Sequence, residues 1–213
     1  MNLQELADRA RALSGIRLQS VRSDEQVEQV VNESYQEILG LQPWPFLRGD
    51  ATVSLPAGQP TFTLPQEFRT LTSVLLTMGS DTVRLKQTTV DALDEYEQDP
   101  GEPAYYARVT DRQIRVWPPP RQEASVEVKG QLEYDLLKGS AVPVFAEQFH
   151  PVLAYRAATR MLVEEGDDSG RSESYQLEAS GYLQRMEKYY LASGDIGLIR
   201  IGSSRRGRLA RRY

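Results

Sequence analysis

The apolar residues of this chain change their spacing twice, and this change restricts the possible folds more than any other feature. In residues 1–42 and again in residues 144–194 they recur every three to four positions, as on one side of a helix. Between residues 50 and 136 they alternate with polar residues in short runs that turn residues separate. The pattern predicts an α+β protein, in which a helical bundle body contains an inserted antiparallel β domain.

Two helices at the start of the chain have clear boundary signals. Asn2 is a suitable cap for a helix over residues 2–13, and Gly15 follows its end. Ser23 and Gln26 form a capping-box pattern for a second helix, which Gly40 is predicted to end. Both helices would leave an apolar stripe in water if they stood alone.

Two more helices are predicted after Pro143. Pro151 fits a first helical turn, where its missing N–H is not needed. A second apolar stripe runs from Tyr175 to Tyr190 and ends before Gly194. The two helical segments are therefore expected to pack as one discontinuous body, because only packing removes their stripes from water.

The middle of the chain is rich in strand and turn signals. The spacing predicts strands over 52–55, 61–64, 70–78, 82–86, 105–109, 113–117 and 125–134, with a short acidic helix over 89–98. Seven short antiparallel strands at this spacing indicate a sandwich or a small barrel. The proline-flanked rings of residues 43–47 are expected to fill a seam between two parts of the structure.

Residue types needed for common enzyme and metal sites are scarce. The chain has no cysteine, which excludes disulfides, thiolate zinc sites and thiol nucleophiles. It has no phosphate-binding loop, no zinc-protease motif and no nucleophile elbow. The only enzyme class that remains is a hydrolase with His150 in its active site. A local hydrogen bond at the start of a helix is the simpler interpretation of this histidine. We therefore predict a protein that is not an enzyme and needs no cofactor.

Two acidic segments and two tryptophans were considered as binding sites. Residues 164–168 and 91–99 carry carboxylates that could hold a divalent cation, but their spacing matches no calcium loop, so solvated segments are expected. Trp44 and Trp117 could stack on sugars or bases, but packing in the core is the more common role. No metal site is predicted.

No membrane association is expected. The longest apolar runs are far shorter than the ~20 residues that span a bilayer. The first residues show neither a basic region nor an apolar core typical of a signal peptide. The absence of cysteine agrees with a reducing compartment.

Residues 195–213 form a basic C-terminal arm on an acidic protein. The chain carries −5 overall, and six of its 25 basic residues but none of its 30 acids lie in residues 196–213, so the rest carries −11. Too few apolar residues are present there for the arm to fold alone. Three interpretations remain: a solvated segment, a nucleic-acid contact, or docking onto an acidic protein groove. The alternation around Ile199 and Ile201, typical of an added strand, favours docking.

Several short motifs occur in an order that resembles the adaptor, or head–tail connector, proteins of tailed bacteriophages. They are WPFL at 44–47, LPAGQPTFTLP at 55–65, PAYY at 103–106, IRVWPPP at 114–120 and FHPVL at 149–153. The resemblance extends over most of the chain. It implies a structural virion protein with a helical body, an inserted β part and an extended C-terminal arm.

The resemblance also implies partners and a location. Such adaptors form a ring, commonly a dodecamer, below the portal and join the capsid to tail or nozzle proteins. DNA passes through the ring during ejection without being specifically bound, and assembly takes place in the host cytoplasm. The residues expected to contact the portal are Ile199, Arg200, Ile201, Arg205, Arg206, Arg208, Leu209, Arg211, Arg212 and Tyr213. The alternative is a nucleic-acid-binding module that acts through the arginine-rich tail.

Overall fold

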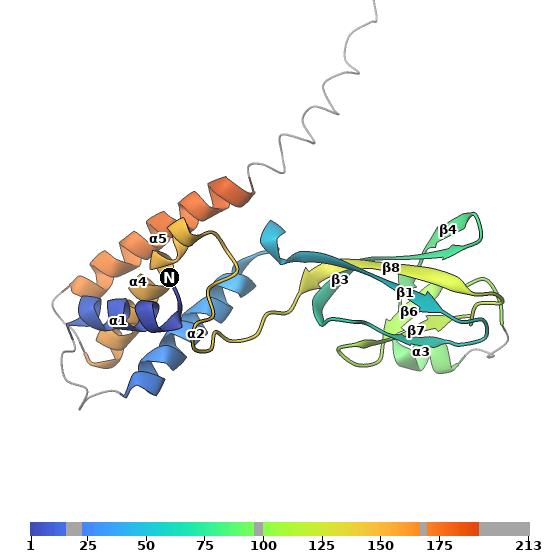
Figure 1. Ribbon diagram of the computed structural model, residues 1–213, viewed down its shortest axis with the longest axis horizontal. Helices are drawn as coiled ribbons and strands as arrows, with labels where there is room; N and C mark the ends of the chain where they lie inside the picture. Colours follow the sequence, from blue (N-terminus) through green and yellow to red (C-terminus); the bar gives the residue numbers. More distant parts are fainter. Residues whose placement is uncertain (16–22, 96–99, 167–169, 192–213) are drawn as a thin grey trace, which may run out of the picture. The chain divides into compact units, whose positions relative to one another are not determined.

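The computed structural model describes residues 1–15, 23–95, 100–166 and 170–191 (Figure 1). The chain divides into two compact units. The helical unit combines Met1–Phe46 with the segment that begins at Asp135, and the β unit is Leu47–Tyr134. The four longest described helices lie in the first unit and the described strands in the second. The predicted α+β class is confirmed.

Helix α1 (Leu3–Ser14) begins and ends where its sequence predicts. Oδ1 of Asn2 accepts the N–H of Glu5 at 2.9 Å, and the Glu5 carboxylate accepts the N–H of Asn2 at 3.0 Å. These reciprocal bonds satisfy two N–H groups that would have no partner within the helix. Gly15 ends the helix with a left-handed φ of 72°, a conformation that suits glycine.

Helix α2 (Asp24–Leu41) begins with the same arrangement, formed by Ser23 and Gln26. Its predicted end at Gly40 is wrong, because the helix continues through this residue. Gln42 then takes an extended backbone and ends it. Packing of the last turn against the unit therefore outweighs the low helix propensity of glycine at Gly40.

Helix α4 (Pro151–Glu164) is the centre of the helical unit. Pro151 occupies the predicted first turn. The helix contacts α1, α2 and α5 (Arg171–Tyr190). Seven of its residues are buried: Val152, Leu153, Ala154, Ala157, Ala158, Met161 and Leu162. The longer α5 buries only Ala179 and Met186, so α5 is a peripheral helix with most of its surface open.

The β unit consists of two four-stranded sheets. Its strands are β1 (Arg48–Leu55), β2 (Thr61–Thr63), β3 (Phe68–Met78), β4 (Asp81–Arg84), β5 (Lys86–Gln87), β6 (Tyr105–Arg108), β7 (Gln113–Trp117) and β8 (Ala124–Leu132). One sheet has the order β1-β8-β3-β4 and the other β2-β7-β6-β5. A short helix, α3 (Val90–Asp94), begins at the Thr89 side chain, and residues 96–98 of the predicted helix lie outside the described ranges.

One hydrophobic core is shared by the two sheets. Strand β8 shows how the sequence builds it, because Val126 and Val128 are buried while Ser125 and Glu127 between them are not. The buried cluster draws on both sheets: Ala51, Leu55, Phe62, Leu64, Phe68, Val74, Leu76, Leu85, Tyr106, Ile114, Val116, Ala124, Val126 and Val128. The unit is thus a sandwich, one of the two predicted arrangements.

The predicted strand over residues 82–86 is divided between the two sheets. Strand β4 ends at Arg84, and buried Leu85 donates its N–H to the carbonyl of Val74 at 2.9 Å. Strand β5 then joins the second sheet and pairs with β6 in parallel. The expectation of antiparallel pairing throughout is wrong at this pair, because the chain crosses between sheets at Leu85.

Strands β3 and β8 approach each other most closely at Gly130. A Cβ atom placed on Gly130 would lie 2.2 Å from the carbonyl oxygen of Thr70 and 3.2 Å from the Cα atom of Leu71. The pairing register shifts on both sides of this point. Only glycine fits here, because the nearest atoms belong to the backbone and have little freedom to move.

Candidate interaction surfaces of the helical unit

The portal-contact residues predicted from the sequence, Ile199 to Tyr213, lie outside the described residues. The structure does describe the end of α5, after which the arm begins. This end is enclosed by an aromatic cluster, defined as Trp44, Phe46, Phe145, Phe149, Tyr189 and Tyr190. The described residues therefore define the point from which the arm starts.

The aromatic cluster holds the last turn of α5 against two other segments. The ring of Tyr190 lies 4.8 Å from that of Phe46 and 6.3 Å from that of Trp44, between centroids. The Tyr190 hydroxyl accepts the N–H of Ala146 at 2.8 Å. Leu191 continues the helical bonding by donating its N–H to Glu187 at 2.8 Å. The last turn of α5 is thus fixed to the helical unit.

Trp44 corrects one prediction from the sequence. Its side chain is fully buried, and its Nε1–H donates to the carbonyl of Ile38 at 2.6 Å. Its described ring partners, Phe46 and Tyr190, belong to the same helical unit. The rings of residues 43–47 were expected at a seam between two parts of the structure, but Trp44 and Phe46 pack inside one part, because the aromatic end of α5 supplies their contacts.

His150 forms the local hydrogen bond that its sequence position predicted and also contacts Met1, which is distant in the sequence. The side chain is buried, its Nε2 lies 2.9 Å from the carbonyl oxygen of Phe145, and its Nδ1 lies 3.0 Å from the Met1 amino group. A neutral ring that donates from Nε2 and accepts at Nδ1 satisfies both contacts. Burial lowers the pKa of His150, because the charged ring would lose its hydration.

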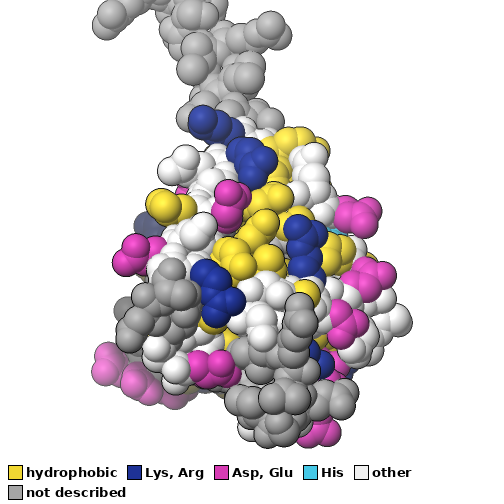
Figure 2. Space-filling view, turned by 90° about the vertical axis from the view of Figure 1, so that its left-hand side faces the viewer, with side chains coloured by type: hydrophobic (Ala, Val, Ile, Leu, Met, Phe, Trp, Pro, Cys, Tyr) yellow, Lys and Arg dark blue, Asp and Glu magenta, His cyan; other side chains and the backbone are white. Residues whose placement is uncertain are grey.

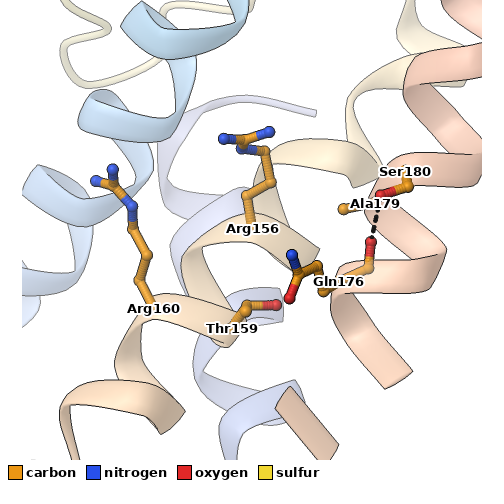
Figure 3. A pocket seen from close by; sticks show the side chains of 6 residues that line it. All are labelled: Arg156, Thr159, Arg160, Gln176, Ala179 and Ser180. Atoms are coloured by element: carbon orange, nitrogen blue, oxygen red, sulfur yellow. Dashed lines mark hydrogen bonds between the residues drawn. The ribbon is translucent and has the colours of Figure 1, made fainter. Parts of the chain in front are cut away.

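A groove lies between α4 and α5 (Figure 3). It has a volume of about 220 Å³ and is lined by Arg156, Thr159, Arg160, Gln176, Ala179 and Ser180. The two arginines extend toward α2, while Gln176 and Ser180 come from α5 across the groove. The Thr159 and Ser180 hydroxyls donate to carbonyls of their own helices. The lining of the groove is more apolar than polar, and its hydroxyl oxygens can still accept hydrogen bonds.

Ion pairs join α4 to α2 beside this groove. Arg156 donates to Glu37 at 2.7 Å, and Arg160 donates to Glu33 at 2.9 Å and also to Glu37. Because the carboxylates already balance both guanidinium groups, the groove is not expected to attract an anion. Sequence reasoning missed this set. The signal was present, since acids four residues apart on one helix match arginines four residues apart on another.

A second groove runs along the solvent side of α2, and we name it the acidic groove. It has a volume of about 440 Å³ and is lined by Glu25, Glu28, Gln29, Asn32, Glu33, Gln36 and Leu136. Asn32 fixes its wall, because its side chain donates to the Leu137 carbonyl at 3.1 Å and accepts the Leu137 N–H at 2.7 Å. Leu136 is held beside the carboxylates with half of its surface exposed.

A third surface combines tyrosines with arginines, and we name it the tyrosine–arginine patch: Tyr155, Tyr175, Tyr182, Arg9 and Arg185. The Tyr155 ring lies 5.8 Å from that of Tyr175 and 5.9 Å from that of Tyr182. Arg185 lies over Tyr182 at 4.2 Å, and Arg9 over Tyr155 at 5.9 Å. Figure 2 shows one face of the protein, on which hydrophobic side chains gather with basic and acidic side chains around them.

The tyrosine–arginine patch was only partly foreseen. Tyr175 and Tyr182 were assigned to an apolar helical stripe, yet both are only half-buried. The spacing of Tyr182 and Arg185, three residues apart on one helix, could have revealed their stacking. The approach of Arg9 to Tyr155 could not, because α1 and α4 are far apart in the sequence. Tyrosine and arginine are the residue types most enriched at protein interfaces.

The remaining sequence candidates have structural roles or incomplete descriptions. Asp94 pairs with Arg115 at 2.5 Å, and Trp117 packs on Tyr105 with 6.2 Å between ring centroids. Residues 96–99 of the first acidic segment and residues 167–168 of the second lie outside the described ranges. Within those ranges, no group of three or more acidic or histidine side chains is placed to hold a metal ion. Likewise, no described helix is both long enough and apolar enough to cross a bilayer.

The chain was compared with protein-family models and with curated proteins. No match was found among curated proteins. The model of one protein family, described as the SU10 adaptor protein, matches residues 1–208. The match therefore includes both units and most of the arm. Because the match covers nearly the full length of the chain, the chain belongs to the SU10 adaptor protein family.

Proposed function

We propose that the protein is a structural head–tail adaptor of a tailed phage, which forms a ring below the portal and joins the capsid to the tail. The observation that carries this proposal is the family match over residues 1–208. A match of this extent includes the aromatic end of α5 and part of the arm. The helical body, the inserted β domain and the arm then act as separate parts of one connector.

The arm is the proposed portal contact. Ile199 and Ile201 act as anchors in a pocket, and the arginines pair with acidic groups of the portal. The aromatic cluster supports this role, because it fixes Tyr190 in the last turn of the helix that precedes the arm in the sequence. Each arm binds weakly, but the arms of a ring act together through their high effective concentration. A dodecamer in the virion is the proposed assembly, with tail or nozzle proteins on its other side.

The charge distribution suits a channel through which DNA passes. Residues 1–195 carry −11, so phosphate groups are repelled rather than held. DNA can then leave the capsid without adhering to the ring. The protein acts at the head–tail junction of the virion after assembly in the host cytoplasm, and this role requires no catalysis.

Co-sedimentation with purified portal rings tests the proposal. Full-length protein is compared with a 1–195 truncation at physiological salt, and a variant with Ile199→Ser and Ile201→Ser keeps the charge but removes the anchors. We expect saturable binding by the full chain, none by the truncation and weakened binding by the double variant. If the truncation binds as well as the full chain, the arm is not the contact.

The same proteins test the alternative, a nucleic-acid-binding module. Such a module predicts that the full chain binds DNA with an affinity that falls steeply as salt rises. The adaptor proposal predicts weak, non-specific DNA binding at most. If neither form sediments with portal rings while the full chain binds DNA in this salt-dependent way, the alternative replaces the adaptor.

A further inference from the structure

Two surfaces of the helical unit have complementary chemistry. The tyrosine–arginine patch offers aromatic rings and guanidinium groups from α1, α4 and α5. The acidic groove offers the carboxylates of α2 next to the exposed side chain of Leu136. Both belong to one compact unit, so their relation does not depend on the position of the β unit.

Four charged groups of these surfaces form no ion pair among the described residues of the unit. Among the described residues, Arg9 and Arg185 stack on tyrosine rings and form no ion pair. Glu25 and Glu28 likewise have no basic partner within the described ranges, in contrast to Glu33, which pairs with Arg160. Unpaired cations on one surface and unpaired anions on the other are the pattern expected of two sides that meet in an interface.

The two surfaces also face in different directions. Figure 3 shows α2 and α5 on opposite sides of α4. The acidic groove lies on α2 away from its buried residues Val27, Val31 and Ile38. A contact between two different surfaces is heterologous, and repeating it by rotation generates a ring, whereas a contact between identical surfaces closes as a dimer.

Helix α5 leaves much of its apolar surface uncovered. It buries only Ala179 and Met186, while Tyr189 is 55% exposed and Leu177 74% exposed. Twenty residues of helix extend over about 30 Å, long enough to span a substantial interface.

We propose that the tyrosine–arginine patch of one copy binds the acidic groove of the next copy, and that this is the subunit contact of the ring. The inference rests on the proposed function, because it assumes a ring of identical chains. It names the partner as a second copy of this protein. Leu136 enters the aromatic patch, and Glu25 and Glu28 face Arg9 and Arg185.

Site-directed cross-linking tests this contact without interference from native thiols, because the chain has no cysteine. One variant carries Glu178→Cys, at an exposed position beside the patch, and the other carries Gln29→Cys in the acidic groove. A size tag distinguishes the two chains. They are treated with a short bismaleimide, both as concentrated free protein and after sedimentation on portal rings.

A cross-link is expected in the mixture of the two variants and not in either variant alone. The matched control is Gln184→Cys, which is exposed on the same helix but points away from the patch, and it should not cross-link to Gln29→Cys. Repeating the reaction with 1–195 truncations shows whether the contact forms between two chains that lack the arm. Loss of the cross-link on truncation would mean that the arm, not the patch, occupies the acidic groove.

The outcomes separate this inference from the proposed function. Portal binding without a cross-link in either condition overturns the inferred interface and leaves the adaptor function in place. A cross-link as strong in one variant alone indicates contact between identical surfaces, which also overturns the inference. If the mixture cross-links but portal binding fails, the interface stands as a self-association and the adaptor function fails.

Charge reversal provides an independent measurement. Arg185→Glu and Glu28→Arg should each reduce the yield of the cross-link roughly tenfold, as expected for loss of a favourable charge contact and its replacement by repulsion. Combining the two variants, one on each chain, should restore most of the yield. If both variants cross-link like the unchanged pair, these charges do not meet.

Discussion

The two units of the molecule differ in how completely they bury their apolar side chains. In the β unit the inward side chains of both sheets share one core, and the side chains between them on β8 are polar. Among the described residues, its large exposed hydrophobic side chains are Val83 and Val109, whereas those of the helical unit are Leu41, Leu136, Val142, Val163, Leu177 and Tyr189. The β unit thus completes its own core, while the helical unit retains surface suited to partners.

Gly130→Ala should have the largest effect and should act on the β unit alone. The new methyl group would lie 2.2 Å from the Thr70 carbonyl, so β3 and β8 must separate, at a cost of about 3 kcal/mol. With fluorotryptophan, ¹⁹F NMR in urea follows Trp117 in the β unit and Trp44 in the helical unit separately. We expect the unfolding transition of Trp117 to move to a lower urea concentration and that of Trp44 to stay at the same concentration.

Gly181→Ala is the matched control for this substitution. A Cβ atom at Gly181, on α5, would meet no atom within 4 Å. Alanine should therefore stabilise the helical unit by about 0.5–1 kcal/mol, through higher helix propensity. An equal loss of stability from both substitutions would show that crowding between β3 and β8 is not the cause.

Asn32→Ala should have an intermediate effect, limited to the helical unit. It removes two hydrogen bonds to Leu137 and leaves a buried N–H and carbonyl without partners, at a cost of about 1–3 kcal/mol. Gln29→Ala on the same helix is the control and should change stability by less than about 0.5 kcal/mol. If both variants unfold at the same urea concentration, the contact with Leu137 does not support the wall of the acidic groove.

Acidification should produce the smallest effect, again in the helical unit. Burial lowers the pKa of His150 below its ordinary value of 6.5, so the folded protein binds fewer protons than the unfolded chain. The stabilising contribution is present above pH 6.5 and is lost as the pH falls through the folded pKa. His150 is the only histidine, so the Trp44 transition should weaken between pH 7.5 and 5 more than the Trp117 transition.

A His150→Gln variant provides the control for this pH effect. Glutamine does not titrate, so the difference between the two units over this range should shrink. If the variant loses stability on acidification as the unchanged protein does, the effect arises from groups other than His150.

Local signals made much of the fold predictable from the sequence. Asn2 and Ser23 mark the starts of their helices because capping depends on residues within one turn. Strand β7 occupies the predicted residues 113–117, since alternation and flanking turns define it locally. The parallel pairing of β5 and β6 was not predictable, because it depends on the chain changing sheets at Leu85.

The candidate interaction surfaces were harder to predict from the sequence than the fold. Composition identified the basic arm, since charge can be counted along the chain. The tyrosine–arginine patch could not be assembled in the same way, because its members come from three helices whose packing the sequence does not state. Trp44 shows the same limit: its ring was recognised as a packing group, but its partner Tyr190 lies at the far end of the chain.

The aromatic cluster at the end of α5 has a mechanical consequence. Any tension applied beyond Leu191 reaches the unit at Tyr190. The ring of this residue contacts Trp44, Phe46 and Phe149, and its hydroxyl is bonded to Ala146, so the load is shared between two segments distant in sequence. A helix end without such contacts would unwind turn by turn under the same pull. Here the pull must shear a packed group of rings before α5 can lengthen.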